Sequence, residues 1–465
     1  MLPVNPPGSP PGNSPYSSTS AFAGSPWLIN LDLLRDDGLL DRADVQPASS
    51  FNGAASVDFA ASQKFRLARL RKACEAFASR GGFRDEPFVA FVEEHRSWLD
   101  DFALYGAIKD AQGNKPWSLW PVPLRLRKPE ALRDTRERYA GGVRFHQFVQ
   151  FVFDRQWTAL KSYCNDRNIG LIGDIPIFVA HDSADVWAHR ELFLLDEQGR
   201  ATTLSGYPPD VFNEDGQKWG HPHYNWPAHE RTGFAWWVAR FAYTLRQFDA
   251  ARIDHFLGFD RTWHVPARAR NARRGDWVDT PGDALFRAMR KSLGRAQIIA
   301  EDLGKVTESA AALRDRYKFP GMRIMQFGFG GGDYHLPHRY VGNCVAYTGT
   351  HDNETIAGWF ARLQREAKRS PKESPKRREL EKVKRYVCES RAEPGIHWAM
   401  IRAAMMSVAD TMVLPVQDVL GLGDEARMNV PGTVDDNWRW RLRPGQLTSS
   451  HAQTLADLAD VYDRA

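Results

Sequence analysis

Short apolar runs alternate with longer amphipathic segments from residue 143 to residue 422. Apolar residues recur at helical spacing in the longer segments, whereas each short run has the length and composition of a buried strand. The expected strands lie within 169–180, 251–259, 296–304, 322–329, 344–353 and 411–422, and the expected helices lie at 143–167, 235–248, 283–293, 308–317 and 397–408. Buried strands that alternate with helices predict a parallel sheet and an α/β fold.

The number of these strands favours a (β/α)8 barrel, or TIM barrel, over an open nucleotide-binding sheet. No GxGxxG or GxxxxGK[ST] loop follows any of them, and such loops mark the open sheets that bind dinucleotides or nucleotide phosphates. Residues 50–140 have a helical pattern, interrupted by one strand-like stretch at 119–124. We therefore expect residues 1–465 to form a single catalytic barrel domain into which 50–140 insert as a helical subdomain.

Polar residues follow four of these six strands. They are Asp174, then Arg252 and Asp254, then Glu301 and Asp302, and finally His351, Asp352, Asn353 and Glu354. The carboxyl ends of barrel strands build the active site. One such acid alone could cap the next helix, but buried carboxylates are costly unless they are paired or used. Four polar strand ends predict an active site.

Arg252, Asp254 and Glu301 together indicate a particular chemistry. Residues two apart on a strand share a face, so Arg252 and Asp254 are expected side by side, where the guanidinium keeps the carboxylate ionised. Glu301 follows the apolar run IIA, and an apolar setting near a like charge favours the protonated acid. One ionised and one protonated carboxyl group are what a retaining glycosidic reaction requires.

Composition excludes several other classes of protein. The net charge is only +5 over 465 residues, and the densest basic run, 366–386, is interpreted as a solvated helix face and loop. Neither nucleic acid nor a membrane is expected as a partner, because no nucleic-acid-binding signature and no apolar run long enough to span a bilayer occur. The four cysteines show no CxxC spacing, and the N-terminal segment MLPVNPPGSPPGNSP lacks the basic and apolar regions of a signal peptide, so we predict a cytoplasmic protein with free thiols.

Several segments resemble a known enzyme family. ARIDHF, IIAEDLG and YTGTHDNET are similar to the catalytic regions of the α-amylase superfamily, and GDIPIFV is similar to its strand-three region. Longer blocks resemble the amylomaltases, or disproportionating enzymes, which are 4-α-glucanotransferases. These blocks are SPYSSTSAFAGSPWLI, GDIPIFVAHDSADVWAHRELFLLDEQG, GYPPDVFNEDGQKWGHPHYNW, GMRIMQFGF and LPVQDVLGLGDEARMNVPGT. The resemblance extends from about Leu2 to Leu442.

This resemblance implies a role for each matching residue. Asp254 would be the nucleophile, Glu301 the acid/base, and Asp352 the acid that stabilises the transition state. Arg252, His255 and His351 would hold the nucleophile and the sugar ring that Asp352 binds. Asp174 would support that subsite. The remaining residues implied to line donor and acceptor subsites are Tyr16, Asp210, Gln217, Trp219, Phe327 and Asn429. For Tyr16 and Trp219, core packing is the alternative to a sugar platform.

The chain departs from the family pattern at three places. Leu257 stands where the family commonly has arginine, and His221 stands where asparagine is usual. Family members also carry a strand, a helix and most of a second strand before a segment like LPLNPTG, which here is MLPVNPPG at Met1. Leu2–Val4 is the remnant expected of that second strand. We therefore expect a barrel that lacks its first strand at the N-terminus.

The expected activity is transfer of α-1,4-glucan segments by a double displacement through a covalent glucanyl-enzyme. No metal or organic cofactor is implied, since no HExxH, EF-hand or dinucleotide motif occurs. Maltodextrins and other glucans derived from glycogen or starch are the expected substrates. Two alternatives stay open at this point: an α-glucan hydrolase, in which water takes the second step, and a non-catalytic glucan-binding protein on a truncated barrel.

Overall fold

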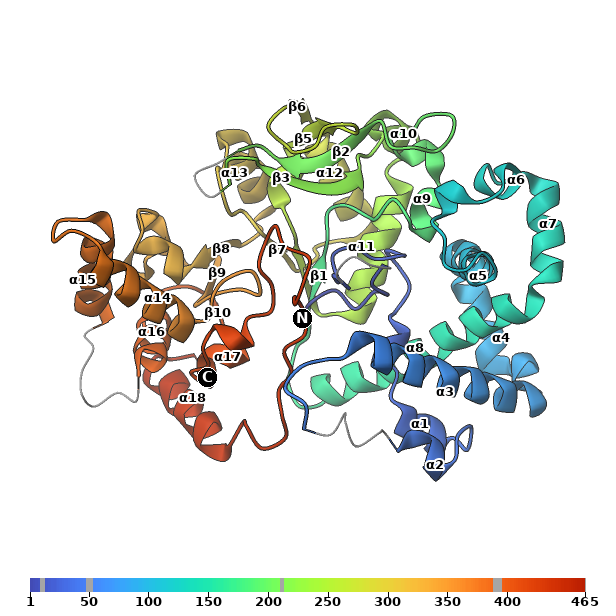
Figure 1. Ribbon diagram of the computed structural model, residues 1–465, viewed down its shortest axis with the longest axis horizontal. Coiled ribbons are helices and arrows are strands. Elements are labelled where there is room, and N and C mark those ends of the chain that lie inside the picture. The colour runs from blue at the N-terminus through green and yellow to red at the C-terminus, as the bar shows by residue number, and fades with distance from the viewer. Residues whose placement is uncertain (9–12, 47–52, 210–212, 388–394, 465) are drawn as a thin grey trace. The chain divides into compact units, whose positions relative to one another are not determined.

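The structure is a computed structural model, and it describes residues 1–8, 13–46, 53–209, 213–387 and 395–464. The chain divides into two compact units. Unit 1 comprises Met1–Pro47, Phe59–Ile298 and Val306–Leu313, and unit 2 comprises Ala48–Asp58, Ile299–Lys305 and Arg314–Ala465. Each unit is built mainly of helices around a few strands (Figure 1).

Most helices of unit 1 precede or alternate with its strands. They are α1 (Leu31–Asp36), α2 (Arg42–Val45), α3 (Phe59–Ser79), α4 (Glu86–Glu94), α5 (Arg96–Ala111), α6 (Val122–Arg125), α7 (Pro129–Arg138), α8 (Ala140–Asn165), α9 (Ala184–Ala188), α10 (Trp226–Arg231), α11 (Ala235–Gln247) and α12 (Gly282–Leu293). Unit 2 contains α14 (Ile356–Arg369), α15 (Pro375–Val387), α16 (Ile396–Met405), α17 (Val416–Val419) and α18 (Ser449–Val461). Helix α13 (Glu308–Tyr317) begins in unit 1 and ends in unit 2.

All six predicted strands exist, and they form one parallel sheet. They are β1 (Ile172–Ile175), β4 (Ala250–Ile253), β7 (Ile298–Ala300), β8 (Gly321–Ile324), β9 (Cys344–Tyr347) and β10 (Thr411–Val413), in the order β1-β4-β7-β8-β9-β10. Unit 1 holds β1 and β4, unit 2 holds β8, β9 and β10, and β7 is shared. The predicted α/β fold with a parallel sheet is therefore confirmed; in the described residues this sheet is curled into a six-stranded half-barrel.

Burial explains why these strands could be found from apolar runs. All four residues of β9 are buried, as are all three residues of β7, which is typical of strands covered on both faces. In β4 the pattern alternates: Ala251 and Ile253 are buried, whereas Arg252 is only partly buried. The predicted remnant strand at Leu2–Val4 is wrong, because this segment is not a strand and the Val4 carbonyl instead accepts the N–H of Ser25.

The helical region of unit 1 packs around α8. Figure 1 shows α3, α5 and α8 close together, and α8 contacts both of the other helices. Helices α3 and α8 share a core that contains Leu70 and Ala73 of α3 and Phe148 and Val152 of α8, all fully or almost fully buried. Residues 119–124 form no strand: Leu119 ends a short 3-10 helix, and residues 122–124 lie in α6. Proline recurs there at Pro121 and Pro123, and proline favours the first turn of a helix over a paired strand.

A second, antiparallel sheet in unit 1 was not expected from the sequence. It consists of β2 (Thr203–Tyr207), β3 (Gln217–Pro222), β5 (Arg261–Pro266) and β6 (Asp276–Asp279), in the order β3-β2-β5-β6. Its strands carry no apolar run, and all four residues of β6 are exposed. Such a sheet is stabilised by cross-strand pairs rather than by a buried run. One of these pairs joins Trp263 of β5 to Trp277 of β6, with ring centroids 5.4 Å apart.

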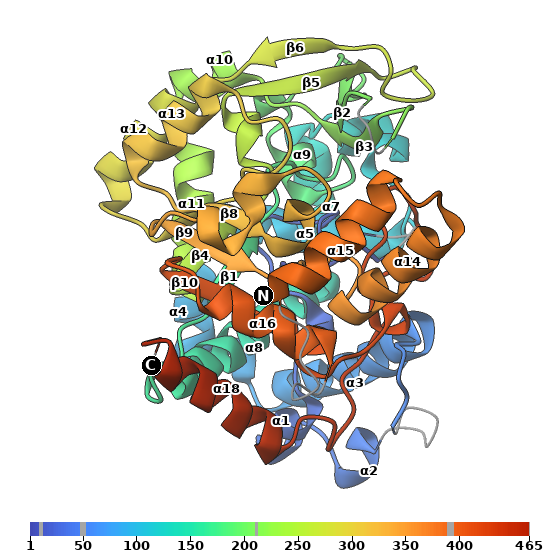
Figure 2. The ribbon, with the colours of Figure 1, turned by 90° about the vertical axis from the view of Figure 1, so that its left-hand side faces the viewer.

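In unit 2 the helices form a core of their own. Figure 2 shows α14, α15 and α16 near one another, and α14 contacts both α15 and α16. Trp359 and Leu363 of α14 pack in one cluster with Val383 of α15 and Met400 of α16. No helix in the described part of the chain is long and apolar enough to cross a membrane.

Candidate active site

The pairing of β1 with β4 brings two predicted site residues of unit 1 together. Asp174 is the register partner of Arg252, although the two residues are 78 positions apart in the chain. The N–H of Asp254 donates to the carbonyl of Ile175 over 3.0 Å, so the ladder continues one residue past β4. The strand geometry therefore places Arg252 and Asp254 on one face, as the sequence predicted.

A continuous chain of polar contacts runs through four of the predicted residues. The Tyr16 hydroxyl donates to Oδ2 of Asp174 over 2.7 Å, and Nη1 of Arg252 donates to both carboxylate oxygens of Asp174 over 2.8 Å. The other arm of the guanidinium, Nη2, donates to Oδ1 of Asp254 over 3.0 Å. One planar guanidinium thus fixes two carboxylates at once.

Exposure distinguishes the two carboxylates that Arg252 binds. The side chain of Asp174 is 4% exposed, whereas that of Asp254 is 29% exposed. Burial and the nearby Asp174 carboxylate raise the pKa of Tyr16 well above its usual value, so the phenol stays protonated and donates. Asp174 is therefore held inside the protein by its neighbours, while Asp254 presents a carboxylate edge that a ligand can reach.

His255 turns the chain directly after Asp254. Its φ of 48° is in the left-handed region, which is uncommon for a residue with a side chain. Burial lowers its pKa to about 4, so the imidazole is neutral near pH 7. The ring of Trp219 on β3 lies edge-on to the imidazole at 4.8 Å, and the Trp219 indole N–H donates to Oε1 of Gln217 over 3.2 Å.

Three further residues of this region are the predicted subsite residue Asp210 and the two departures from the family pattern, Leu257 and His221. Asp210, a predicted subsite residue, lies outside the described residues. Leu257 is buried, 8% exposed, in a 3-10 turn at Phe256–Phe259, so an apolar residue fits this position. His221 lies on β3, and burial lowers its pKa to about 4; its imidazole is uncharged at neutral pH, like the asparagine usual there.

In unit 2, Glu301 and Asp302 follow β7 but have different environments. Asp302 is 3% exposed; its Oδ1 accepts the N–H of Met322 over 2.7 Å, and Arg314 donates to its Oδ2. An acid so enclosed positions the start of β8 and is no candidate for chemistry. Oε1 of Glu301 accepts the N–H of Leu303 over 2.9 Å, and Glu301 is 9% exposed. Glu301 is therefore the candidate of this pair.

The segment after β9 carries a second polar cluster in unit 2. Nδ2 of Asn429 donates to Oδ1 of Asp352 over 2.6 Å, and Nε2 of His351 lies 3.4 Å from the same oxygen. The Asn429 N–H donates to the His351 carbonyl over 3.0 Å. The structure therefore brings three predicted residues together, and the Asp352 side chain stays 45% exposed. Phe327, the remaining predicted residue of unit 2, is 40% exposed and contacts the ring of His335.

Two positioning residues near this cluster were missed by the sequence reasoning. Nη2 of Arg427 donates to the carbonyl of Asp352 over 2.8 Å, and its Nε donates to the carbonyl of Asn429. Asp418 is 1% exposed and accepts from the Thr348 hydroxyl over 2.7 Å and from the Ile356 N–H over 2.8 Å. Both residues lie in the block LPVQDVLGLGDEARMNVPGT, so a charged residue within an otherwise apolar block was the available signal.

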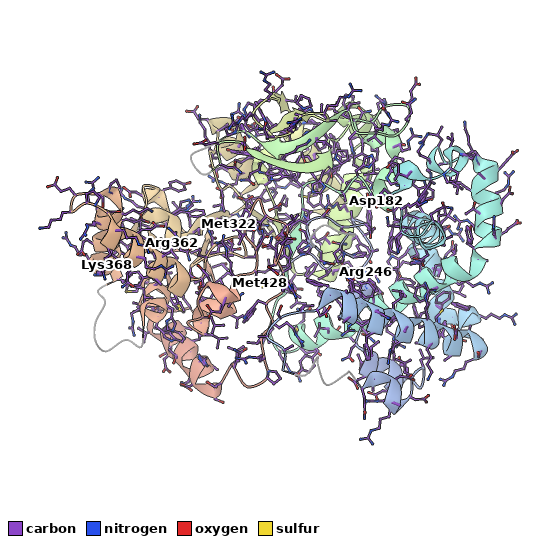
Figure 3. All side chains as sticks on the ribbon, viewed as in Figure 1. Asp182, Arg246, Met322, Arg362, Lys368 and Met428 are labelled. Atoms are coloured by element: carbon purple, nitrogen blue, oxygen red, sulfur yellow. The ribbon has the colours of Figure 1, made fainter. Side chains whose placement is uncertain are left out.

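Glu354, next to these residues, also has a structural role. Arg362 of α14, labelled in Figure 3, donates to both of its carboxylate oxygens, the shortest contact being 2.6 Å. Burial raises the pKa of Glu354, but the interactions with Arg362, Asp424 and Arg427 together outweigh burial, so the pKa is lowered. Glu354 therefore attaches the end of the segment to α14. Among the described residues, no group of three or more His, Cys, Asp and Glu side chains is arranged to hold a metal ion.

The strand ends of this parallel α/β sheet present carboxylates that are bound by arginine or by an amide. Such an arrangement is typical of enzymes that use general acid–base catalysis on glycosides. Comparison with known proteins narrows this class. The family model described as 4-alpha-glucanotransferase matches residues 1–448. The chain belongs to the 4-alpha-glucanotransferase family, and it is an enzyme that transfers segments of α-1,4-glucans.

Individual relatives agree with this assignment. A 4-alpha-glucanotransferase of Thermus thermophilus is 43% identical over 473 residues, which cover 100% of this chain and 91% of that protein. One from Synechocystis sp. is 42% identical, with coverages of 100% and 90%. A solved structure of amylomaltase from Streptococcus agalactiae, in complex with acarbose, has a TM-score of 0.92 and 36% identity, and covers 100% of this chain and 91% of that chain.

Proposed function

We propose that glucan transfer by this enzyme is a retaining double displacement with Asp254 as the nucleophile. Its carboxylate would attack the anomeric carbon of the donor glucan and form a covalent glucanyl-enzyme. The observation that supports this role is the bond from Arg252 to one oxygen of a carboxylate that is still 29% exposed. An arginine neighbour favours the ionised form, and the exposure leaves room for attack.

Glu301 is proposed as the general acid and base. It would protonate the glycosidic oxygen as the donor bond breaks, and then take the proton of the acceptor 4-hydroxyl as the new α-1,4 bond forms. Asp352 would bind sugar hydroxyls and stabilise the positively charged transition state. The bonds from Asn429 and His351 to one of its oxygens support this role, because they orient the carboxylate before a sugar binds.

The remaining predicted residues are proposed to bind the glucan. Arg252, His255 and His351 would hold the reacting sugar and the nucleophile, and Asp174 would support them. Tyr16, Asp210, Gln217, Trp219, Phe327 and Asn429 would line the neighbouring subsites. For Trp219 the support is its partial exposure beside His255, since an exposed indole face stacks well against the C–H face of a pyranose. Maltodextrins and other α-1,4-glucans from glycogen or starch would be donors and acceptors.

We also propose a complete barrel architecture and a cellular compartment for the protein. We take the curled parallel sheet as part of a (β/α)8 barrel in a catalytic domain formed by the whole chain, with residues 50–140 as its helical insertion. We take the cytoplasm as the compartment. In support, Cys74, Cys164 and Cys344 are all free thiols, and burial raises the pKa of the Cys74 thiol to about 11, which suits an unreactive structural cysteine in a reducing compartment.

The test of this proposal is the incubation of the purified enzyme with maltotriose. We expect glucose and longer maltodextrins, with almost no gain in total reducing ends, because transfer makes one bond for each bond broken. Asp254→Ala should lose activity by roughly 10⁴-fold or more, as catalytic residues do when removed. Glu301→Gln should lose transfer from maltotriose but still become glycosylated by a glucosyl fluoride, whose leaving group needs no acid.

The matched control is Asp302→Asn, which alters the neighbouring acid of the same strand end. Because Asp302 is bound by Arg314 and the Met322 N–H, this change should lower the melting temperature more than the rate per folded molecule. Reducing ends that rise in step with bond cleavage would mean hydrolysis. Retention of activity in Asp254→Ala would reject Asp254 as the nucleophile.

A further inference from the structure

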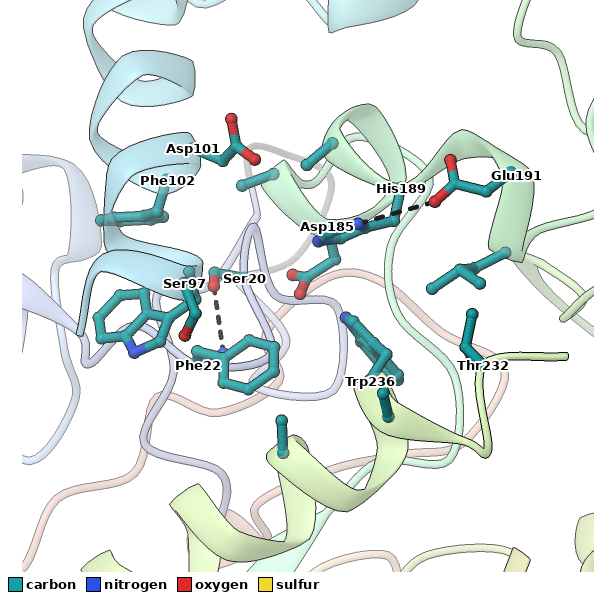
Figure 4. Close-up of a pocket in the computed structure, with 16 residues that line it drawn as sticks. Ser20, Phe22, Ser97, Asp101, Phe102, Asp185, His189, Glu191, Thr232 and Trp236 are labelled. Carbon is teal, nitrogen blue, oxygen red and sulfur yellow. Dashed lines mark hydrogen bonds and ion pairs between the residues drawn. The ribbon is translucent and has the colours of Figure 1, made fainter. Parts of the chain in front are cut away.

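A cavity in unit 1 lies apart from every residue proposed above for catalysis or glucan binding. It has a volume of about 290 Å³ and is walled by the segment around Ser20 and Phe22, by α5, by the end of α9 and by the start of α11 (Figure 4). This volume is at the lower end of the range for ligand pockets. It is suited to a single ring rather than to a chain of rings.

The cavity has a buried floor and an exposed rim. Ser20, Phe22, Asp185 and Trp236 on the floor are between 2% and 7% exposed. Ser97, Glu191 and Thr232 belong to the lining and are exposed. A ligand can therefore enter from the rim and be largely buried at the floor, as in most small-molecule sites.

Four Phe and Trp side chains line the cavity and supply apolar walls: Phe22, Trp98, Phe102 and Trp236. Phe22 lies parallel to Trp98, with ring centroids 6.2 Å apart and 13° between the planes. It is perpendicular to Trp236, at 6.0 Å and 87°. Two ring planes at right angles enclose a corner, and flat apolar faces of this kind are what the C–H face of a sugar ring packs against.

The floor also contains an unpaired donor. Nε1 of Trp236 is buried and has no hydrogen-bond partner among the described residues. Figure 4 shows this nitrogen at the edge of the ring that points toward Asp185 and His189. An unsatisfied buried N–H is costly. This nitrogen has almost no accessible surface, so an incoming oxygen with a lone pair would accept from it after a small turn of the Trp236 ring. An ammonium group cannot, because it has no lone pair.

Three carboxylates line the cavity, and two of them pair with a basic side chain of the protein. Nη2 of Arg127 donates to Oδ1 of Asp101 over 2.7 Å. Nδ1 of His189 lies 3.8 Å from Oε1 of Glu191, and the interaction with Glu191 and Asp185 raises the pKa of His189 against the opposing effect of burial. Asp185 accepts the N–H of Ala21 over 2.8 Å through Oδ2. Burial raises the pKa of Asp185, so this carboxyl group takes up a proton more readily than an exposed one. With two carboxylates paired and the third disfavoured as an anion, a neutral ligand is favoured over a charged one.

We propose that this cavity is a binding site for one neutral, hydroxyl-bearing ring of the size of a glucose unit. Its C–H face would lie in the corner formed by Phe22 and Trp236. One hydroxyl would accept from Nε1 of Trp236 and donate toward Asp185, which a hydroxyl group can do because it is both donor and acceptor. The proposal does not depend on the catalytic roles given above.

The experiment observes the cavity directly by methyl NMR of the full-length enzyme, labelled at leucine and alanine methyl groups. Leu192 and Ala184 both line the cavity and are 5% exposed, so their methyl signals report binding there. Glucose alone is the probe, since it contains no glycosidic bond to transfer. We expect saturable shifts of both signals in the wild type and, equally, in Asp254→Ala. Ala188→Phe, which fills the cavity from α9, should weaken the binding roughly tenfold or more, since a filled pocket excludes the ring.

The matched control is Ala78→Phe, which adds the same side chain on an exposed position of α3 outside the cavity; it should leave the shifts unchanged. Melting temperature and maltotriose transfer establish that each variant is folded. If Ala188→Phe does not fold, Ala239→Leu at the exposed rim replaces it. Maltotriose added to Asp254→Ala shows where the bound ring comes from. If it shifts the Leu192 signal as glucose does, the site binds the end of a glucan chain; if only glucose shifts the signal, the site binds the free sugar.

Three results would overturn the proposal. The first is the absence of any shift at Leu192 with glucose. The second is an unchanged glucose response in both folded cavity-filling variants. The third is a response to benzylamine, a cationic ring of similar size, that is stronger than the response to glucose. Failure of wild-type maltotriose transfer would reject the proposed mechanism and leave this test intact.

Discussion

Arg252 shows how one side chain can determine the properties of a site. Among the contacts described, its guanidinium donates three hydrogen bonds to two carboxylates, two to Asp174 and one to Asp254. The side chain is only 11% exposed, so these bonds are shielded from water and salt. The Arg252–Asp254 contact could be predicted from their spacing on a strand. The contact with Asp174 could not, because it depends on the register between β1 and β4.

Arg252→Lys is the change that isolates this geometry. A lysine keeps the positive charge but is a point donor and cannot span two carboxylates as the planar fork does. We expect transfer to fall roughly 10²-fold, since misplacement of a reacting group costs about that much, with a smaller effect on KM. Initial rates of maltotriose disproportionation measure it.

The control for Arg252→Lys is Arg246→Lys. Arg246 also contacts two carboxylates, Glu94 over 2.7 Å and Asp154 over 3.3 Å, but its side chain is 40% exposed. Exposed ion pairs contribute little, so this variant should retain its rate and its melting temperature. Equal loss of activity in both variants would show that general destabilisation, rather than the fork at Arg252, causes the effect.

At the scale of elements, Asp418 of α17 connects the end of β9 to the start of α14. One carboxylate oxygen accepts from Thr348, just after β9, and the other accepts from the N–H of Ile356, the first residue of α14. The segment between these two contacts contains His351 and Asp352. Asp418 therefore sets the length and position of the segment that presents Asp352, although it contacts no predicted site residue among the bonds described.

Burial raises the pKa of Asp418 to about 6, against the opposing effect of its two hydrogen bonds. A raised acid pKa means that the folded protein binds a proton more readily than the unfolded chain between about pH 4 and 6. This group therefore favours folding below about pH 4 and loses that contribution as the pH rises through about 6. The change amounts to at most about 3 kcal/mol for two pKa units.

Two substitutions separate the hydrogen bonds of Asp418 from its charge. Asp418→Asn keeps an acceptor for the Ile356 N–H and carries no charge. It should be at least as stable as the wild type at pH 7, and its stability relative to the wild type should be lower at pH 4.5 than at pH 7. Asp418→Ala removes both bonds and should lower transfer activity. Urea unfolding at the two pH values and maltotriose transfer measure these effects; Asp435→Asn, at an exposed position, is the control. A stability difference between Asp418→Asn and the wild type that does not vary with pH would contradict the assignment.

The two sheets show what the sequence could and could not predict about elements. The parallel strands were predictable because each is a short buried run, such as the Cys344–Tyr347 strand. The antiparallel sheet was not, because its strands mix exposed polar residues with isolated tryptophans such as Trp277. Gln217 and Trp219, which lie on β3, were consequently expected in the site only through family resemblance. Their contact with each other and with His255 required the structure.

At the scale of the whole molecule, histidine burial is a property that no single motif reveals. The chain has 14 histidines. For seven of these, burial is the largest cause of a strongly lowered pKa. The pKa is lowered to about 3 for His223 and to about 4 for His95, His221, His229, His255, His264 and His335. These side chains lie in both units, so the effect is distributed over the molecule. Sequence position alone does not distinguish them from exposed histidines such as His338.

These lowered pKa values predict that the enzyme loses stability in mild acid. The unfolded chain takes up a proton at each such histidine near pH 6.5, whereas the folded protein takes it up only near pH 4. Unfolding therefore binds protons between these values. The stabilising contribution is complete above about pH 6.5 and is lost as the pH falls, by at most about 1.4 kcal/mol per pH unit for each histidine. The melting temperature should fall steeply from about pH 6.5 to pH 5, before most carboxylates titrate.

His335→Gln tests this explanation at one site of unit 2. Nδ1 of His335 accepts the N–H of Ile324 over 3.1 Å, which requires the neutral ring, and the amide oxygen of glutamine can accept the same bond without titrating. The variant should therefore show a shallower fall of melting temperature between about pH 6.5 and 5. His338→Gln, at an exposed position three residues away, should keep the wild-type slope. Identical slopes in all three proteins would show that the acid sensitivity originates in groups other than the buried histidines.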